Sequence, residues 1–188
     1  MSSERVQREV AKRVFAGEFN DAYYTYKTSD DERAPTYLLL PTGERANRVF
    51  LVGTLTEKEE IGSDSEYWRA RVVDPTGTFF IYAGQYQPEA MEKVRDIQPP
   101  EYVAVVGKPS TYETDEGDVM VSVRPESINV VDEDTRDRWI AETAERTIER
   151  IKEGLPEDLE GVDEEPALLY DEPTRYRDVV TTALENLG

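Results

Sequence analysis

Cysteine and histidine are both absent from this chain of 188 residues. Without cysteine there is no disulfide bond, no thiolate metal site and no cysteine nucleophile. The lack of histidine removes the commonest general base and a common metal ligand, and with them most hydrolases and zinc enzymes. These two absences favour a binding protein over an enzyme.

Lysine is scarce, because the 22 basic residues are 16 arginines and 6 lysines; 41 acidic residues give a net charge of −19. An acidic, lysine-poor surface keeps a protein hydrated in concentrated salt, where the Debye length is only ~3 Å at 1 M. The composition therefore predicts a halophilic protein, and the alternative is an ordinary acidic protein with disordered tails. Because affinity for phosphates falls steeply with salt, a halophilic nucleic-acid binder depends more on base stacking. The net charge thus does not exclude a nucleic-acid partner.

Long apolar runs are also missing. No stretch approaches the ~20 residues of a membrane span, and the first ten residues (MSSERVQREV) are too charged for a signal peptide. We therefore expect a cytoplasmic protein with no membrane partner. Acidic pairs such as Asp30 and Asp31 arise by chance in so acidic a chain, and LPTGERAN lacks the GK[ST] of a phosphate loop. We expect no enzymatic activity, no cofactor and no metal site.

What is present is a run of strands with clear turn signals between residues 48 and 131. The segments 48–55 (RVFLVGTL) and 67–73 (YWRARVV) have the β-branched and alternating patterns of strands, and DPTG at 74–77 predicts a tight turn into a third strand. The rest of the region predicts a helix at 88–97, a strand at 102–106, a hairpin tip at 115–117 and a strand through Val119, Val121 and Val123. This β-β-β-α-β-β order predicts a mainly β protein built on the five-stranded oligonucleotide-binding barrel, the OB-fold. SH3-like barrels share much of the pattern.

Four segments of this region, taken in order, carry a family resemblance: VGTLTE, DPTGTFFIYAGQY, VVGKP and RPESINVV. They resemble the replication protein A (RPA)-associated proteins of halophilic archaea, which are similar to the middle subunit of eukaryotic RPA. The resemblance extends through TRDRWIAETAERTIERI, so it covers residues 48–151 best. It implies an OB-fold, single-stranded DNA as a partner, and a larger RPA subunit in a hetero-oligomer.

Two extensions flank the predicted barrel domain, 48–131. Residues 1–47 predict a helix from Ser3 to near Gly17, with Val6, Val10 and Val14 on one face, followed by an added strand at 36–40. Three tyrosines between these elements are expected to cover the barrel or a partner: Tyr23, Tyr24 and Tyr26. After the barrel we expect an amphipathic helix at 132–154, an acidic linker at 155–173 and a short helix at 174–188.

The helix at 132–154 has apolar residues at three- and four-residue spacing. This stripe has two interpretations: packing on the chain's own barrel, or joining a helix of a partner. RPA subunits, which the chain resembles, assemble through helices that follow their barrels. The residues expected at a partner interface are Trp139, Ile140, Ala144, Ile148 and Ile151.

A candidate nucleic-acid site follows from strand alternation. If Trp68, Ala70 and Val72 point inward, then Arg69 and Arg71 point outward. The same parity directs Phe80 and Tyr82 outward, so that aromatic rings and guanidinium groups share one surface suited to bases and phosphates. The resemblance places further base-stacking aromatics near Tyr86 and Tyr112, although the family usually has Phe at the latter position. The full set of candidates is Tyr67, Arg69, Arg71, Phe80, Tyr82, Tyr86, Lys108 and Tyr112.

The sequence is compatible with two functions. One is a non-enzymatic OB-fold partner of an RPA-type single-stranded DNA-binding complex in DNA replication and repair. The other is an assembly protein that stabilises the large RPA subunit without contacting DNA, which the acidity and the scarcity of lysine favour. Outward aromatics also have a structural interpretation, since they could lie beneath one of the extensions.

Overall fold

The protein is described by a computed structural model that covers residues 9–157, 169–170 and 172–187. Its strands are β1 (Lys12–Arg13), β2 (Thr25–Lys27), β3 (Thr36–Leu39), β4 (Arg45–Ala46), β5 (Val49–Glu60), β6 (Trp68–Asp74), β7 (Gly77–Ala83), β8 (Glu101–Glu113) and β9 (Val119–Val130). Its helices are α1 (Ala16–Phe19), α2 (Pro88–Asp96), α3 (Glu133–Glu153), the 3₁₀ turn η2 (Pro173–Tyr176) and α4 (Arg177–Leu184). Among these residues, no helix is both long enough and apolar enough to cross a membrane.

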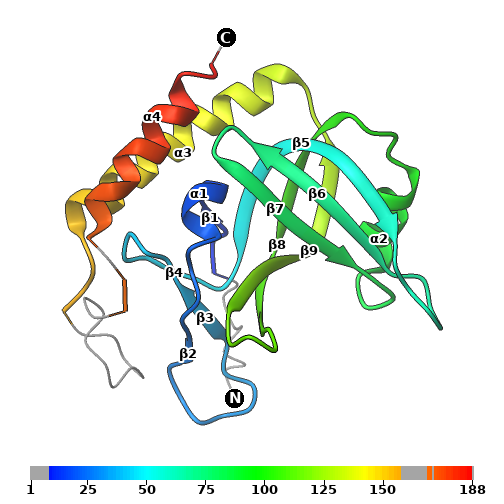
Figure 1. Ribbon diagram of the computed structural model, residues 1–188, viewed down its shortest axis with the longest axis horizontal. Coiled ribbons are helices and arrows are strands. Elements are labelled where there is room, and N and C mark those ends of the chain that lie inside the picture. The colour runs from blue at the N-terminus through cyan, green and yellow to red at the C-terminus, as the bar shows by residue number, and fades with distance from the viewer. Residues whose placement is uncertain (1–8, 158–168, 171, 188) are drawn as a thin grey trace, which may run out of the picture.

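Five long strands close into a barrel (Figure 1). β5, β6 and β7 form an antiparallel meander, β9 pairs with β8, and β8 returns to β5. β7 and β9 meet in parallel through Ile81 and Val123, which completes the circle. With α2 inserted between β7 and β8, the order β-β-β-α-β-β of the OB-fold is confirmed. The five strands lie within the predicted bounds of 48–131, and β5, β8 and β9 run further than their sequence patterns indicate.

The predicted parity of the central strands is also confirmed. Ala70 and Val72 of β6 and Phe79 and Ile81 of β7 are at most 1% exposed, while Trp68 packs partly buried against the same core. Inward side chains that alternate with outward ones are what a half-buried strand requires. Because these side chains fill the barrel, the alternate residues of β6 and β7 must lie on its outer surface.

The turn between β6 and β7 connects the barrel to the N-terminal extension. The buried carboxylate of Asp74 accepts hydrogen bonds from the Thr76 and Gly77 amides, as an Asx turn does, and from the Ala16 amide at the start of α1 (2.8 Å). Burial nevertheless raises the pKa of Asp74 above its usual value. A turn residue thus also holds α1 against the barrel.

The N-terminal extension differs from the prediction. The described part of the expected helix, residues 9–15, is extended; β1 pairs in parallel with β5, and α1 is a single turn. Val10, expected on the packed face, is 79% exposed, whereas the adjacent residues Val14 and Phe15 are both fully buried. Adjacent buried residues do not fit a helical stripe, and the Arg48 carbonyl accepts a hydrogen bond from the Lys12 amide as in a sheet edge. Residues 3–8 of the predicted helix lie outside the described residues.

The rest of the extension is a small antiparallel sheet, β2–β3–β4, in which β3 is the added strand that the sequence predicts. A second apolar cluster forms here from Tyr26, Tyr37, Leu39 and Leu169. The Tyr170 hydroxyl donates to the Leu39 carbonyl (2.7 Å) and accepts from the amides of Tyr23 and Tyr24. The tyrosines of the extension therefore hold it to the segment that precedes α4. The predicted acidic linker falls largely on residues outside the described range.

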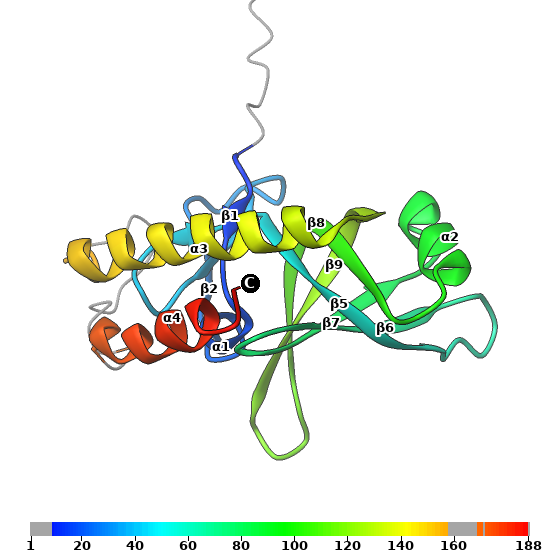
Figure 2. The ribbon, with the colours of Figure 1, turned by 90° about the horizontal axis from the view of Figure 1, so that it is seen from above.

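α3 begins and ends where the sequence predicts. The Asp132 carboxylate caps it by accepting from the Thr135 amide, and Gly154 ends it with a φ of 71°. Its apolar stripe packs on the chain itself: the Trp139 indole donates to the Phe50 carbonyl (3.1 Å) and lies edge-on to Phe15. α4 runs along α3 on the same side of the barrel (Figures 1 and 2).

The residues expected at a partner interface are covered by other parts of this chain. Four of these side chains are buried, at most 7% exposed: Trp139, Ile140, Ala144 and Ile151. The fifth, Ile148, is partly buried against the main core. In the structure the helix packs on its own barrel. The physical reason is that α1 and α4 supply the apolar surface that a partner's helix was expected to supply.

Candidate nucleic-acid interface

The outer face of β6 and β7 brings together four of the predicted side chains. In the antiparallel register Arg69 lies opposite Tyr82, and Arg71 lies opposite Phe80. All four point away from the core, because their neighbours along each strand fill the barrel. In Figure 1 this face is turned toward the viewer, with α3 and α4 to one side and α2 at the other.

The aromatic rings of this face lie near one another and near a cation. The rings of Tyr67 and Tyr82 are stacked at a centroid separation of 6.0 Å and an interplanar angle of 25°. The Arg71 guanidinium lies 5.6 Å from the centre of the Phe80 ring. Tyr67 is 38% exposed, and Tyr82 and Phe80 are half-buried. The face thus offers flat π surfaces flanked by cations, the arrangement on which unpaired bases stack.

The two cations are balanced by carboxylates on the neighbouring strand. Across the β5–β6 ladder Glu59 lies opposite Arg69 and Glu57 opposite Arg71, with nitrogen-to-oxygen distances of 2.5 and 3.6 Å. The hydrogen bond to Glu59 raises the pKa of Arg69. Exposed ion pairs of this kind contribute only about 0 to 1 kcal/mol. A phosphate group can therefore replace either carboxylate at little cost.

A long hairpin formed by the ends of β8 and β9 stands beside this face; we call residues 108–124 the arm. Figure 2 shows the arm projecting well beyond the rest of the molecule. Tyr112, 53% exposed, lies opposite Met120 near its tip, and Lys108 lies opposite Arg124 at its base. The tip turns at Gly117, whose φ of 88° agrees with the predicted hairpin.

Arg124 belongs to the same surface and was not among the predicted residues. Ile81 of β7 pairs with Val123 of β9, so the next residue of each strand, Tyr82 and Arg124, faces outward at the junction. The sequence carried a signal for it: Val121 and Val123 alternate inward, and Arg124 is then outward. That Arg124 continues the outer row of β6 and β7 could not be predicted from this alternation, because it depends on the pairing of β7 with β9.

Tyr86 and Lys108 lie apart from the β6–β7 face, in a groove. Tyr86 is 86% exposed and precedes α2, and Lys108 is exposed at the base of the arm. The groove, about 1020 Å³, runs between the start of α2, the base of the arm and residues 32–37 of the N-terminal extension. The structure therefore divides the eight predicted residues into an outer-face group and a groove group, with Tyr112 toward the tip of the arm.

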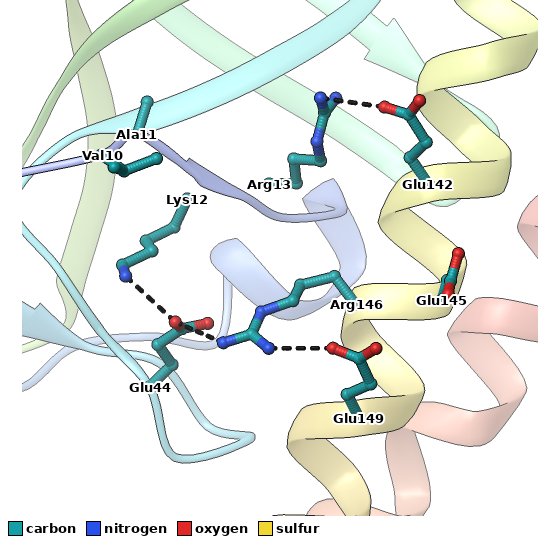
Figure 3. Close-up of a pocket in the computed structure, with 9 residues that line it drawn as sticks. All are labelled: Val10, Ala11, Lys12, Arg13, Glu44, Glu142, Glu145, Arg146 and Glu149. Atoms are coloured by element: carbon teal, nitrogen blue, oxygen red, sulfur yellow. Dashed lines mark hydrogen bonds and ion pairs between the residues drawn. The ribbon is translucent and has the colours of Figure 1, made fainter.

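Another hollow, about 460 Å³, lies between β1 and α3 (Figure 3). Here Glu44 accepts from both Lys12 and Arg146, while Arg13 pairs with Glu142. Four carboxylates line this hollow against three cations, so its net negative charge makes it a poor binding site for an anion. Within the described ranges, no cluster of three or more acidic side chains is arranged to hold a metal ion.

Comparison with known proteins gives structural but not sequence relatives. No model of a known protein family matches the chain, and no curated protein sequence matches it. The chain is similar in structure to one chain of a replication protein A heterotrimer bound to single-stranded DNA, with a TM-score of 0.53 and 13% identity over 76% of this chain and 98% of that one.

Two further solved structures match a smaller share of this chain. One is the second single-stranded DNA-binding protein of Mycobacterium smegmatis, with a TM-score of 0.39 and 17% identity over 45% of this chain and 86% of that one. The other is the mitochondrial single-stranded DNA-binding protein Rim1 of S. cerevisiae, with a TM-score of 0.36 and 18% identity over 45% and 92% of the two chains. At 13% identity, the likeness to the replication protein A chain establishes the fold alone.

Proposed function

We propose that this chain binds single-stranded DNA on the outer face of β6 and β7 and acts, without enzymatic activity, as a subunit or partner of an RPA-type complex in DNA replication and repair. The observation that carries the proposal is the open row of Arg69, Tyr82, Arg71 and Phe80, continued by Arg124 on β9. Bases would stack on the rings, and the guanidinium groups would meet the phosphates or stack in turn.

Membership in a larger complex is supported by the likeness to a chain of an RPA heterotrimer over 98% of that chain. The packing of α3 on its own domain means that a larger RPA subunit has to contact other surfaces than the buried stripe of Trp139 and Ile140. We also propose that the acidity reflects a cell with concentrated salt, because the paired carboxylates of the face weaken any purely ionic attraction of DNA.

Anisotropy of a labelled oligothymidine in molar KCl tests DNA binding, with the chain alone and together with the large RPA subunit. Each stacked base contributes about 1 to 3 kcal/mol, so Tyr82→Ala combined with Tyr67→Ala, whose rings stack on each other, is expected to weaken binding at least tenfold. A control that removes exposed apolar side chains elsewhere, Leu184→Ala with Leu187→Ala, should bind as the wild type does.

The second candidate is an assembly protein that never touches DNA, and the ion pairs that neutralise Arg69 and Arg71 favour it. It predicts no binding by the isolated chain and no effect of the tyrosine changes in the complex. That pair of results, with co-purification of the large subunit retained, would replace the first proposal by the second.

A further inference from the structure

In the described part of the chain, most of the basic side chains without an ion pair or hydrogen bond line the groove beside the barrel. Among the residues that the structure describes, the basic side chains that form neither an ion pair nor a hydrogen bond are Lys27, Arg33, Lys108, Arg124, Arg138, Lys152 and Arg177. The first four of these line the same groove. In a chain with a net charge of −19, such a concentration on one surface needs an explanation.

The four cations come from opposite walls. Lys27 at the end of β2 and Arg33 in the following loop belong to the N-terminal extension, and Lys108 and Arg124 face each other across the base of the arm. Tyr86 lines the groove on the barrel side. Lys27 and Arg33 precede Lys108 and Arg124 by at least 75 residues, and the sheet geometry brings the two walls together.

Two of the four acidic residues that line the groove already have partners within the chain. Glu9 accepts from Tyr37 and Arg45, and Glu126 is paired with Arg48 at 2.5 Å. Glu32 and Glu89 are exposed lining residues. Glu32 and Glu89 are thus the two acids that oppose the four uncommitted cations, and the groove is far less negative than the chain as a whole. An extended polyanion with spaced charges, rather than a small multiply charged anion, suits cations that stand on facing walls.

The wall formed by the extension is held in place. The Asn47 amide group donates to the Thr36 carbonyl (3.1 Å), and the Arg45 guanidinium covers the Tyr37 ring at 4.1 Å. Tyr37 in turn packs with Tyr26 at a centroid separation of 5.8 Å. The strands on either side of the loop are thus fixed, and a preorganised wall loses less entropy on binding a ligand.

The groove is also connected to the barrel face. Arg124 lies at the junction with Tyr82 of β7 and lines the groove as well. A strand that stacks on Tyr82 therefore has a continuous path of cations past Arg124 and Lys108 to the extension. We infer that the groove guides the phosphate backbone of the same single strand away from the barrel face, with Lys27 and Arg33 of the N-terminal extension as its outer phosphate contacts. This inference rests on the proposed function and adds the extension to the binding site.

The experiment changes only the wall that the barrel does not supply. In the full chain, Lys27→Gln with Arg33→Gln is compared with Lys152→Gln with Arg177→Gln, an equal change of charge on α3 and α4 outside the groove. Affinity is measured as a function of salt for oligothymidines of about 4 and about 16 nucleotides, the range of OB-fold site sizes. Each phosphate contact to a single strand contributes about 0.7 to the slope of log affinity against log salt, so the groove variant should lose about 1.4 with the longer oligonucleotide.

With the shorter oligonucleotide, which fills only the barrel face, the groove variant should bind as the wild type does. A wild-type slope for the groove variant with the longer oligonucleotide overturns the inference, and so does an equal loss in the α3–α4 control variant. Both of those results leave binding on the barrel face intact. Failure of the wild type to bind either oligonucleotide removes the proposed function, and this inference with it.

Discussion

The outer barrel face and the packed side of α3 use the same residue types in opposite surroundings. On the barrel face Arg69 pairs with Glu59 where both side chains meet water; under α3 Arg150 pairs with Glu18 at 2.9 Å with side chains 1% and 0% exposed. Tyrosines stack openly on the first, while Trp139 is enclosed in the second. The comparison teaches that solvent, not residue type, separates a surface that can exchange partners from one that cannot.

The buried pair is fully satisfied by hydrogen bonds. Arg150 donates to Glu18, to the Thr42 hydroxyl (2.8 Å) and to the Arg13 carbonyl (3.0 Å), and Glu18 also accepts from the Thr42 amide. Three segments of the extension and α3 therefore meet at one guanidinium. Glu44 lies 3.5 Å from the same guanidinium as a second carboxylate. With side chains at most 1% exposed, the Arg150–Glu18 pair keeps its geometry because solvent does not compete for either charge.

Loss of one member of this buried pair should give the largest effect. Arg150→Met leaves Glu18 buried and uncompensated, which costs about 3 to 5 kcal/mol in the free energy of unfolding measured with urea. The exposed counterpart, Arg69→Met, should cost less than about 1 kcal/mol. Adding Glu18→Gln to Arg150→Met should recover part of the loss. Equal costs for the two arginines would abolish the distinction drawn above.

The contact between the extension and the segment before α4 should fail in alkali. Burial raises the pKa of Tyr170 to about 12, so the folded chain keeps a proton that the unfolded chain releases near its usual value of 10.0. Tyr176 shifts in the same direction, by burial and its hydrogen bond to Asp21. The stability is therefore present below pH 10 and is lost as the pH rises toward 12, on the order of 2 to 3 kcal/mol for Tyr170.

Urea unfolding at pH 9 and pH 12 measures this loss. Tyr170→Phe should be less stable at pH 9, because its three hydrogen bonds are gone, but should lose less between the two pH values. Tyr112→Phe, on the exposed arm, is the control and should lose as much as the wild type. An undiminished loss in Tyr170→Phe would mean that other groups govern the alkaline limb.

The barrel could be predicted from the sequence because its signals are local. Alternation in β6 and β7 and the DPTG turn each act within a few residues, and each is found where it was predicted. The outward position of Arg69, Arg71, Phe80 and Tyr82 follows from that alternation alone. The local pattern therefore predicted the central part of the candidate site.

The extension and the groove could not be predicted in this way. Val14 and Phe15 are apolar in either a helix or an edge strand, and only the pairing of β1 with β5 decides between them. The stripe of α3 fits any apolar partner, and which one covers it depends on where α1 and α4 fold. No local pattern marks Lys27 and Arg33 as site residues, because they join the candidate site only through the groove that they share with the base of the arm.

Removing the arginines or the carboxylates of the exposed ion pairs should change DNA affinity in opposite directions. Arg69→Gln with Arg71→Gln should change stability by less than about 1 kcal/mol per ion pair but lower the salt slope of oligothymidine binding by about 1.4. Glu57→Gln with Glu59→Gln removes the competing carboxylates and should raise affinity instead. Weaker binding in the glutamate variant would show that these carboxylates position the arginines rather than compete with phosphate.

Glu44 lies between the two extremes of exposure, since its side chain is 16% exposed. Burial acts to raise the pKa of Glu44, but hydrogen bonds from Arg146 and Lys12 outweigh it and hold that pKa below the usual 4.5. A lowered carboxyl pKa stabilises the fold above that value, and the contribution is lost as the pH falls through the folded pKa.

Glu44→Gln should therefore lower stability at pH 7 and flatten the acid limb of the stability curve measured with urea. Glu145→Gln removes a carboxyl from the same hollow, one without an ion pair among the described residues, and should leave the acid limb unchanged (Figure 3). Because Glu44 keeps some contact with water, its loss must fall well short of that for Arg150→Met. A comparable loss would place Glu44 with the buried pair and make the ionic contacts of α3 one cooperative network.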